Sequence, residues 1–167
     1  MSKSKVIGFA KDIISTLIMV AVILGIGYAI TGTYPFMVAV ESGSMVPHMY
    51  RGDVIFLVSP DRTEIVTWAE GMKTGYTSFG DYGDVIVFHP DGDTSKTPII
   101  HRAMAWIEKG MKMPNGQIAP HSGYITKGDH NPVPDQPTLT MPVKKEWVVG
   151  VAKFRIPAVG HLSLLFR

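Results

Sequence analysis

The chain contains no cysteine among its 167 residues. Disulfide bonds, thiolate catalysis and cysteine-based zinc sites are therefore excluded, while the redox compartment stays open. Charge is nearly balanced, because 16 Lys and Arg face 14 Asp and Glu, and no basic cluster is interleaved with aromatic side chains. Nucleic acid is therefore not an expected partner.

Charge is absent from a long apolar run near the N-terminus, which extends from Ile13 to Ile30. A membrane-spanning helix needs roughly 17 to 25 such residues. A cleaved signal peptide is the alternative, but its apolar core usually has about 7 to 15 residues and ends at a small-residue cleavage site. The sequence TGTYPF that follows this run is a poor cleavage site. We therefore predict an uncleaved membrane anchor.

The charges around this run predict its orientation. Lys3, Lys5 and Lys11 precede it, and few charges follow it closely. The positive-inside rule then gives a cytoplasmic N-terminus and a single-pass protein of the cell membrane. We predict three parts: a cytoplasmic start with the anchor over residues 1–31, an extracytoplasmic domain over 32–157, and an apolar tail over 158–167 that is too short to span a bilayer.

Strand-like patterns replace the helical one after the anchor. β-Branched and aromatic runs are separated by Gly and Pro, of which the chain has 17 and 12. No convincing helix is visible in this part, and residues 59–81 are irregular, as expected of an inserted hairpin or a mobile loop. We therefore predict a mostly β fold, in which antiparallel strands curl into barrel-like layers. The expected strands lie within residues 35–42, 52–58, 83–89, 98–107, 122–129 and 146–157.

Ser44 lies in the sequence ESGSMVP, residues 41–47, shortly after the anchor. Gly43 allows a sharp bend, and the small neighbours leave the hydroxyl of Ser44 reachable. A plain turn is the simpler explanation of this stretch by itself. A serine becomes a nucleophile only beside a base, and the histidines are the candidates.

His101 differs from the other histidines because it lies inside an expected strand. Alternation along PIIHRAMAW puts Ile99, His101 and Ala103 on one face. An imidazole held on a rigid strand suits a general base, although a core histidine bonded to a carbonyl fits the same position.

A zinc site is less well supported, since the histidines are loosely spaced and no helix presents a pair at i, i+4. The histidines considered for such a site are His89, His101, His121 and His130.

A carboxylate is needed to orient a histidine base, and the segment TKGDHNPVPDQP offers Asp129 and Asp135. Three prolines stiffen this segment. An Asx-turn explains Asp129 well. It explains Asp135 less well.

Four motifs, taken together, resemble those of type I signal peptidases, the membrane-bound proteases that remove signal peptides. Their order is also the family's order, and they cover most of the chain from residue 41 to residue 150. A single motif is weak, whereas four in order beside an N-terminal anchor are specific. The motifs are SGSMVPHMYRGDVIFL, GDVIVF, IIHRAM and TKGDHNPVPDQ.

The resemblance implies a subclass and a role for each matched residue. Bacterial-type members carry a lysine in the third motif, whereas His101 stands there in this chain, as in the endoplasmic-reticulum and archaeal type. The match implies that Ser44 is the nucleophile, His101 the general base and Asp135 the group that orients it. It also implies that the Ser42 hydroxyl helps to bind the oxyanion and that Asp129 has a supporting role. The implied substrates are preproteins bearing signal peptides. We expect the protein to need no metal and no cofactor.

Two other functions each fit part of these observations. A self-cleaving repressor-type protease resembles the expected fold. It would carry a DNA-binding helical domain and a lysine base, and neither is visible in this sequence. A non-catalytic, membrane-anchored β-domain that acts as an envelope binding or scaffold module explains the anchor and the strands. It gives no reason for the four ordered motifs.

Overall fold

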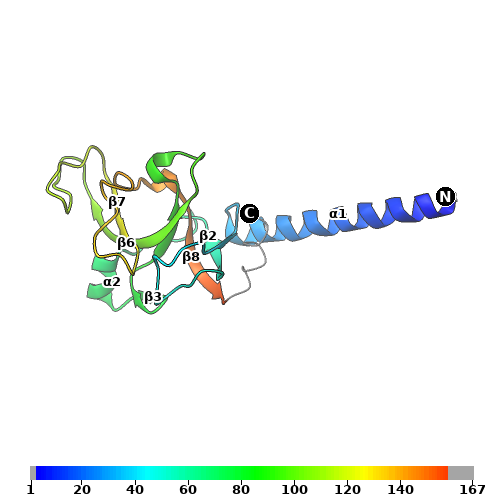
Figure 1. Ribbon diagram of the computed structural model, residues 1–167, viewed down its shortest axis with the longest axis horizontal. Helices are drawn as coiled ribbons and strands as arrows, with labels where there is room; N and C mark the ends of the chain where they lie inside the picture. Colours follow the sequence, from blue (N-terminus) through cyan, green and yellow to red (C-terminus); the bar gives the residue numbers. More distant parts are fainter. Residues whose placement is uncertain (1–2, 158–167) are drawn as a thin grey trace.

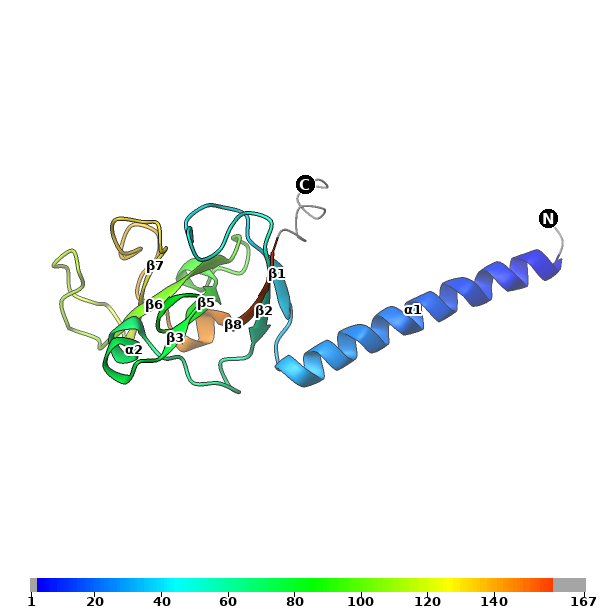
Figure 2. The same cartoon turned by 90° about the horizontal axis from the view of Figure 1, so that it is seen from below.

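The computed structural model describes residues 3–157. A long helix, α1 (Lys3–Thr31), projects from one end of a β-domain, as two perpendicular views show (Figures 1 and 2). Its stretch Ile7–Thr31 is long and apolar enough to cross a membrane, and its residues are exposed apart from Gly27, which is half-buried, and Thr31, which is buried at the junction with the β-domain. A helix with an apolar surface all round is stable only when other apolar groups cover it, which a bilayer does. The helix therefore serves as the membrane anchor.

The β-domain is built on one curled, six-stranded antiparallel sheet. The last strand of the described residues, β8 (Val148–Ile156), lies in its middle, paired with β2 (Val54–Val58) on one side and β5 (Val85–Phe88) on the other. The predicted mostly β fold with curled antiparallel strands is confirmed, and each expected strand contains an observed one. In the order of the sheet the strands are β1 (Met37–Ala39), β2 (Val54–Val58), β8 (Val148–Ile156), β5 (Val85–Phe88), β6 (Ile99–Ile107) and β7 (Gly123–Lys127).

Strand β5 shows how the sheet divides the core. Its side chains alternate, so Val85 and Val87 join one buried cluster while Ile86 and Phe88 join another. Each face of the strand is covered, which is why its sequence is continuously apolar rather than alternating with polar residues. There are two short 3₁₀ turns beside this part of the sheet. The first, η1 (Pro90–Gly92), follows β5, and the second, η2 (Lys145–Trp147), directly precedes β8.

The expectation that the soluble part has no helix is wrong. Helix α2 (Trp68–Thr74) lies within the irregular stretch 59–81 and is followed by a hairpin of β3 (Thr77–Ser78) and β4 (Asp81–Tyr82). Seven residues are too few to show a helical period. The signal that was available is a capping box, in which the Thr67 side chain accepts from the Glu70 N–H and the Glu70 carboxylate accepts from the Thr67 N–H. The hydrogen bonds from Thr67 to the Glu70 carboxylate lower the pKa of Glu70, and the one from the Thr67 backbone N–H has the larger effect.

Asp84 fastens this stretch to the sheet. It is completely buried, and its carboxylate accepts hydrogen bonds from the Val66 N–H at 3.0 Å, the Tyr76 hydroxyl at 2.8 Å and the Lys153 ammonium at 3.1 Å. Burial, and next the hydrogen bond to Asp84, raise the pKa of Tyr76. A buried charge is tolerated only when it is paired in this way. The Gly-Asp pair before β5 is thus a structural anchor for the preceding stretch.

The junction between α1 and the β-domain is held by a second part of the same stretch. Arg62 Nη1 donates to the carbonyls of Ala29 at 2.6 Å and Ile30 at 3.0 Å, and the Ser59 N–H donates to the Thr31 carbonyl at 2.8 Å. The last carbonyls of a helix lack partners within the helix, and a cation there is favourable. The loop after β2 therefore caps the membrane helix and fixes it to the domain.

Replacement of Arg62 by alanine is expected to loosen this junction. The carbonyls of Ala29 and Ile30 lose their donor, so amide hydrogen exchange over residues 32–36 should rise by about tenfold, the value for a loss of roughly 1.4 kcal/mol. Exchange measured by mass spectrometry on detergent-solubilised protein tests this. Arg51→Ala, at an exposed turn position, is the matched control. Equal exchange in the two variants would show that Arg62 does not hold the junction.

Candidate active site

Three predicted site residues from distant segments meet at one place. The Ser44 Oγ lies 3.0 Å from His101 Nε2, and His101 Nδ1 lies 2.7 Å from Asp135 Oδ2. Ser44 belongs to the turn after β1, His101 to β6 and Asp135 to the loop after β7. His101 and Asp135 are each 4% exposed, whereas Ser44 is only half-buried. The hydroxyl thus faces solvent while its two partners lie behind it.

The turn that carries Ser44 is anchored by apolar side chains. Met45 and Met49 are fully buried in the main core cluster, so the backbone on the C-terminal side of Ser44 cannot shift freely. The Ser44 carbonyl accepts a hydrogen bond of 2.8 Å from the His130 N–H. This bond joins the Ser44 turn directly to the loop that supplies Asp135.

Gly128 permits the close approach of these two loops. A Cβ atom at this position would lie 2.7 Å from the Ser44 carbonyl oxygen and 2.8 Å from His101 Nε2. Contacts shorter than 3.0 Å are essentially never seen for a Cβ atom, so a side chain here would displace the hydroxyl from the imidazole. No local sequence pattern indicates this steric requirement at Gly128.

Asp135 is held by a small hydrogen-bonded network. Its Oδ2 accepts from the Thr126 hydroxyl at 2.7 Å, and its N–H donates to the Thr126 carbonyl at 2.9 Å. The Gln136 side chain closes the network, because its Oε1 accepts from the Thr126 N–H and its Nε2 donates to the Thr126 hydroxyl. Thr126 and Gln136 were not anticipated from the sequence, where neither residue type stands out.

This network determines which nitrogen of His101 carries the proton. The ionised Asp135 carboxylate can only accept, so it takes the N–H of His101 Nδ1. The neutral imidazole then presents a lone pair on Nε2 toward the Ser44 hydroxyl. The hydroxyl, imidazole and carboxylate form a continuous chain of hydrogen bonds with the donors in the order that proton transfer requires.

Ser42 lies beside Ser44. Its Oγ is 3.1 Å from the Ser44 Oγ, and the Ser44 N–H points toward it at 3.5 Å. The Ser42 hydroxyl, which the resemblance implies as an oxyanion donor, and the Ser44 N–H therefore both lie beside the Ser44 hydroxyl. Ser42 is exposed, so its hydroxyl is free to turn toward a bound group.

Asp129 does not contact this chain of hydrogen bonds. Its carboxylate accepts from Arg102 Nε at 2.8 Å and Nη2 at 2.7 Å, and it pairs with His48 Nδ1 at 2.7 Å. Arg102 is fully buried, and its Nη1 donates to the carbonyls of Ser78 and Gly83. The cluster ties β6, the Ser44 turn and the β3–β4 hairpin together under the site. Sequence reasoning missed Arg102 and His48, although a charged residue inside an apolar strand was a usable signal.

Replacement of Arg102 by methionine is expected to lower the free energy of unfolding by about 3–5 kcal/mol, because it leaves the Asp129 charge buried without its main partner. Chemical denaturation of the solubilised protein measures this loss. Asp129→Asn added to Arg102→Met should recover part of it, since the unpaired charge is then gone. A loss below about 1 kcal/mol, typical of an exposed ion pair, would contradict this account of the cluster.

The other histidines are dispersed. His121 packs edge-on against Trp147 with ring centroids 5.2 Å apart, and His89 lines a cavity that does not include His101. Across residues 3–157, no three His, Asp or Glu side chains are close enough together to hold a metal ion.

A cavity of about 710 Å³ opens at the Ser44 hydroxyl. Its walls are largely apolar and include Val38, Ala39, Ile100 and Leu139. Strand β1 borders it and ends the sheet, pairing with β2 alone among the described strands. An unpaired strand edge is able to accept a further extended chain.

A β-domain on a membrane helix, with a Ser–His–Asp hydrogen-bonded chain at the mouth of an apolar cavity, defines a membrane-anchored serine hydrolase. Comparison with known proteins narrows this class. The chain is 32% identical over 172 residues to the signal peptidase complex catalytic subunit SEC11 of Schizophyllum commune, covering 95% of this chain and 76% of the relative. The corresponding figures for SEC11 of Yarrowia lipolytica are 31% over 174 residues, 93% and 83%. For human SEC11C they are 30% over 141 residues, 83% and 60%.

The chain therefore belongs to the SEC11 family of signal peptidase catalytic subunits and is a serine peptidase. The resemblance drawn from the four sequence motifs is thereby confirmed. No model of a protein family matches the chain.

Proposed function

We propose that the chain is a membrane-bound serine endopeptidase that removes signal peptides from exported preproteins, with Ser44 as nucleophile and His101 as general base. The observation that carries this proposal is the hydrogen-bonded chain from Ser44 through His101 to Asp135. The relatives, named as signal peptidase catalytic subunits, supply the substrate class. A domain that only binds would have no use for a buried imidazole oriented in this way.

The proposed reaction has two steps. The Ser44 Oγ attacks the scissile carbonyl while His101 Nε2 takes its proton, and Asp135 stabilises the resulting imidazolium. The same nitrogen then gives the proton to the leaving amine, which frees the mature protein and leaves the signal peptide as an ester on Ser44. Water, deprotonated by His101, hydrolyses this ester and restores the hydroxyl.

The Ser42 hydroxyl and the Ser44 N–H are proposed to bind the oxyanion of the tetrahedral intermediate. Ser42→Ala should therefore lower kcat by about 100- to 1000-fold, the usual effect of removing one such donor. KM should change little, because the oxyanion does not exist in the bound substrate and forms only when Ser44 attacks the carbonyl. Steady-state kinetics with Ser42→Thr as the hydroxyl-retaining control measures this. Unchanged kcat in Ser42→Ala would remove this side chain from the oxyanion site.

Substrate binding is proposed to use the free edge of β1. An extended segment of the preprotein adds to this edge through backbone hydrogen bonds, and its side chains enter the apolar cavity beside Ser44. The membrane anchor contributes by holding enzyme and substrate at one surface. A signal peptide is itself an apolar membrane segment, so the shared bilayer raises the effective concentration of the scissile bond at the site. The proposed location of the β-domain is the extracytoplasmic side.

Cleavage of a preprotein inserted in lipid vesicles tests the proposal. Purified full-length protein, reconstituted in the same vesicles, should produce one new N-terminus at the end of the signal peptide, identified by mass spectrometry. Ser44→Ala prepared in parallel controls for contaminating proteases. No cleavage by the wild-type protein, or the same cleavage by both proteins, would contradict the proposed function.

A further inference from the structure

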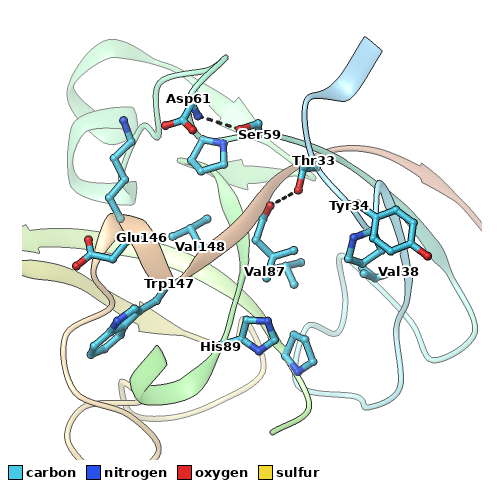
Figure 3. Close-up of a pocket in the computed structure, with 15 residues that line it drawn as sticks. Thr33, Tyr34, Val38, Ser59, Asp61, Val87, His89, Glu146, Trp147 and Val148 are labelled. Atoms are coloured by element: carbon cyan, nitrogen blue, oxygen red, sulfur yellow. Dashed lines mark hydrogen bonds between the residues drawn. The ribbon is translucent and has the colours of Figure 1, made fainter. Parts of the chain in front are cut away.

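A second cavity, which we call the junction pocket, lies where α1 meets the β-domain. Its volume is about 620 Å³. In the close-up, Trp147 and Tyr34 lie at opposite sides of it, with Val87 and His89 between them (Figure 3). Nothing in the proposed mechanism uses this pocket.

The junction pocket continues the cavity at Ser44. Four residues line both, namely Pro35, Val38, Val87 and Pro98. Val87 is 2% exposed and forms a floor common to the two cavities. A single extended chain can therefore lie along both, with one end at the Ser44 hydroxyl.

The position of the junction pocket indicates which end of a substrate would reach it. Thr33 and Tyr34 line the pocket and lie two and three residues after the end of α1 at Thr31. A signal peptide that emerges from the bilayer beside this helix must pass these residues before it reaches Ser44. The segment next to them is therefore the part before the cut bond, an assignment that rests on the proposed function.

The walls of the pocket suit a peptide side chain. Trp147 is held in place by the edge of His121, and a Cβ atom on Gly92 would lie only 2.5 Å from its indole nitrogen. Such a fixed aromatic ring is a good anchor, because little side-chain freedom is lost on binding. His89 Nδ1 is, within residues 3–157, the one buried side-chain nitrogen or oxygen without a hydrogen-bond partner. A buried polar atom of this kind is a place for a ligand group to bond.

We infer that the junction pocket is an upstream substrate subsite, which holds a side chain of the preprotein about five to seven residues before the cut bond. This spacing is the length of extended chain, at ~3.3 Å per residue, that lies alongside residues 35–41. The subsite favours an aromatic or hydrogen-bonding side chain, which stacks on Trp147 or bonds to His89. A lipid headgroup is a poorer occupant, because Asp61 and Glu146 offset Lys145 at the rim.

The first test compares two synthetic peptides that share the same cut bond. One extends about ten residues before it and passes the junction pocket, whereas the other extends about four and does not reach it. Trp147→Ala should lower kcat/KM for the long peptide by about tenfold, because KM rises. It should leave kcat/KM for the short peptide unchanged. Tyr34→Ala repeats the test at a side chain that is 71% exposed, so its removal should not destabilise the core. Trp106→Ala, a tryptophan outside both cavities, is the matched control.

Two kinetic results would overturn the inference. One is an equal loss for the long and the short peptide in detergent. The other is a loss that is seen only when lipid vesicles are present and is the same for both peptides, which would indicate a lipid headgroup in the pocket.

A second test does not depend on turnover and so separates this inference from the proposed function. Ser44→Ala protein is mixed with the long peptide carrying a photoreactive phenylalanine about six residues before the cut bond. After irradiation, mass spectrometry should find adducts in residues 145–149 or 59–61. A peptide with the same group after the cut bond is the control. Adducts confined to other segments would overturn the inference, even if the wild-type protein cleaves both peptides. Failure of wild-type cleavage with adducts in the pocket would instead reject the proposed function.

Discussion

Ser44→Ala is expected to lower turnover of a preprotein by about a million-fold, to the rate that binding and oxyanion stabilisation alone provide. The reason is that, in the proposed mechanism, the Ser44 hydroxyl is the nucleophile, and its 3.0 Å contact with His101 is what activates it. His101→Ala should cost about as much, and the double variant no more than either, because the two groups act as a unit. Single-turnover kinetics with excess enzyme measures this, while the affinity for the preprotein stays near that of the wild type.

The non-additivity is the informative part of this experiment. Losses that multiply, so that the double variant is far slower than either single one, would mean that Ser44 and His101 act independently. Thermal unfolding of each variant is the control for folding, since His101 is buried and a cavity replaces its ring.

Asp135→Asn is expected to lower kcat by about 10⁴-fold. The asparagine amide donates to His101 Nδ1, so the proton of the neutral imidazole moves to Nε2, where it opposes the Ser44 hydroxyl. The shape of the site is unchanged, so KM and the free energy of unfolding should change far less than kcat. Stopped-flow kinetics on a fluorogenic peptide gives both kinetic constants.

Thr126→Val provides a matched comparison for Asp135. It removes the hydroxyl that donates to Asp135 Oδ2 at 2.7 Å but keeps the carboxylate and the shape of the side chain. We expect a loss of only about tenfold, because the carboxylate still accepts from the imidazole. A larger loss in Thr126→Val than in Asp135→Asn would contradict the assignment of Asp135 as the orienting group.

The strands and the site could be predicted from the sequence for different reasons. The strands follow from local patterns, such as the Gly-Asp turns before β2 and β5 and the alternation that puts Ile99 and Ala103 on one face of β6. The three residues Ser44, His101 and Asp135 are 57 and 34 positions apart along the chain, and no local pattern links them. They were found because four motifs stand in the order of a known family.

The supporting residues could not be predicted, because their roles arise only from contacts across the fold. Thr126 and Gln136 are ordinary residues in a strand and a loop until the chain brings them around Asp135. Arg102 is neutralised by a carboxylate 27 positions away. Helix α2 was missed for a local reason, since seven residues make two turns at most and the apolar period is not visible over them.

The most direct test of the central claim uses the absence of cysteine from the chain. Ser44→Cys introduces a single thiol, whose alkylation by iodoacetamide reports its thiolate content. If His101 activates position 44, this thiol should react at pH 7 at least about tenfold faster than the one in Ser42→Cys, and His101→Ala should abolish the difference. Equal rates at the two positions, unaffected by His101→Ala, would contradict the claim that the imidazole of His101 is the base for residue 44.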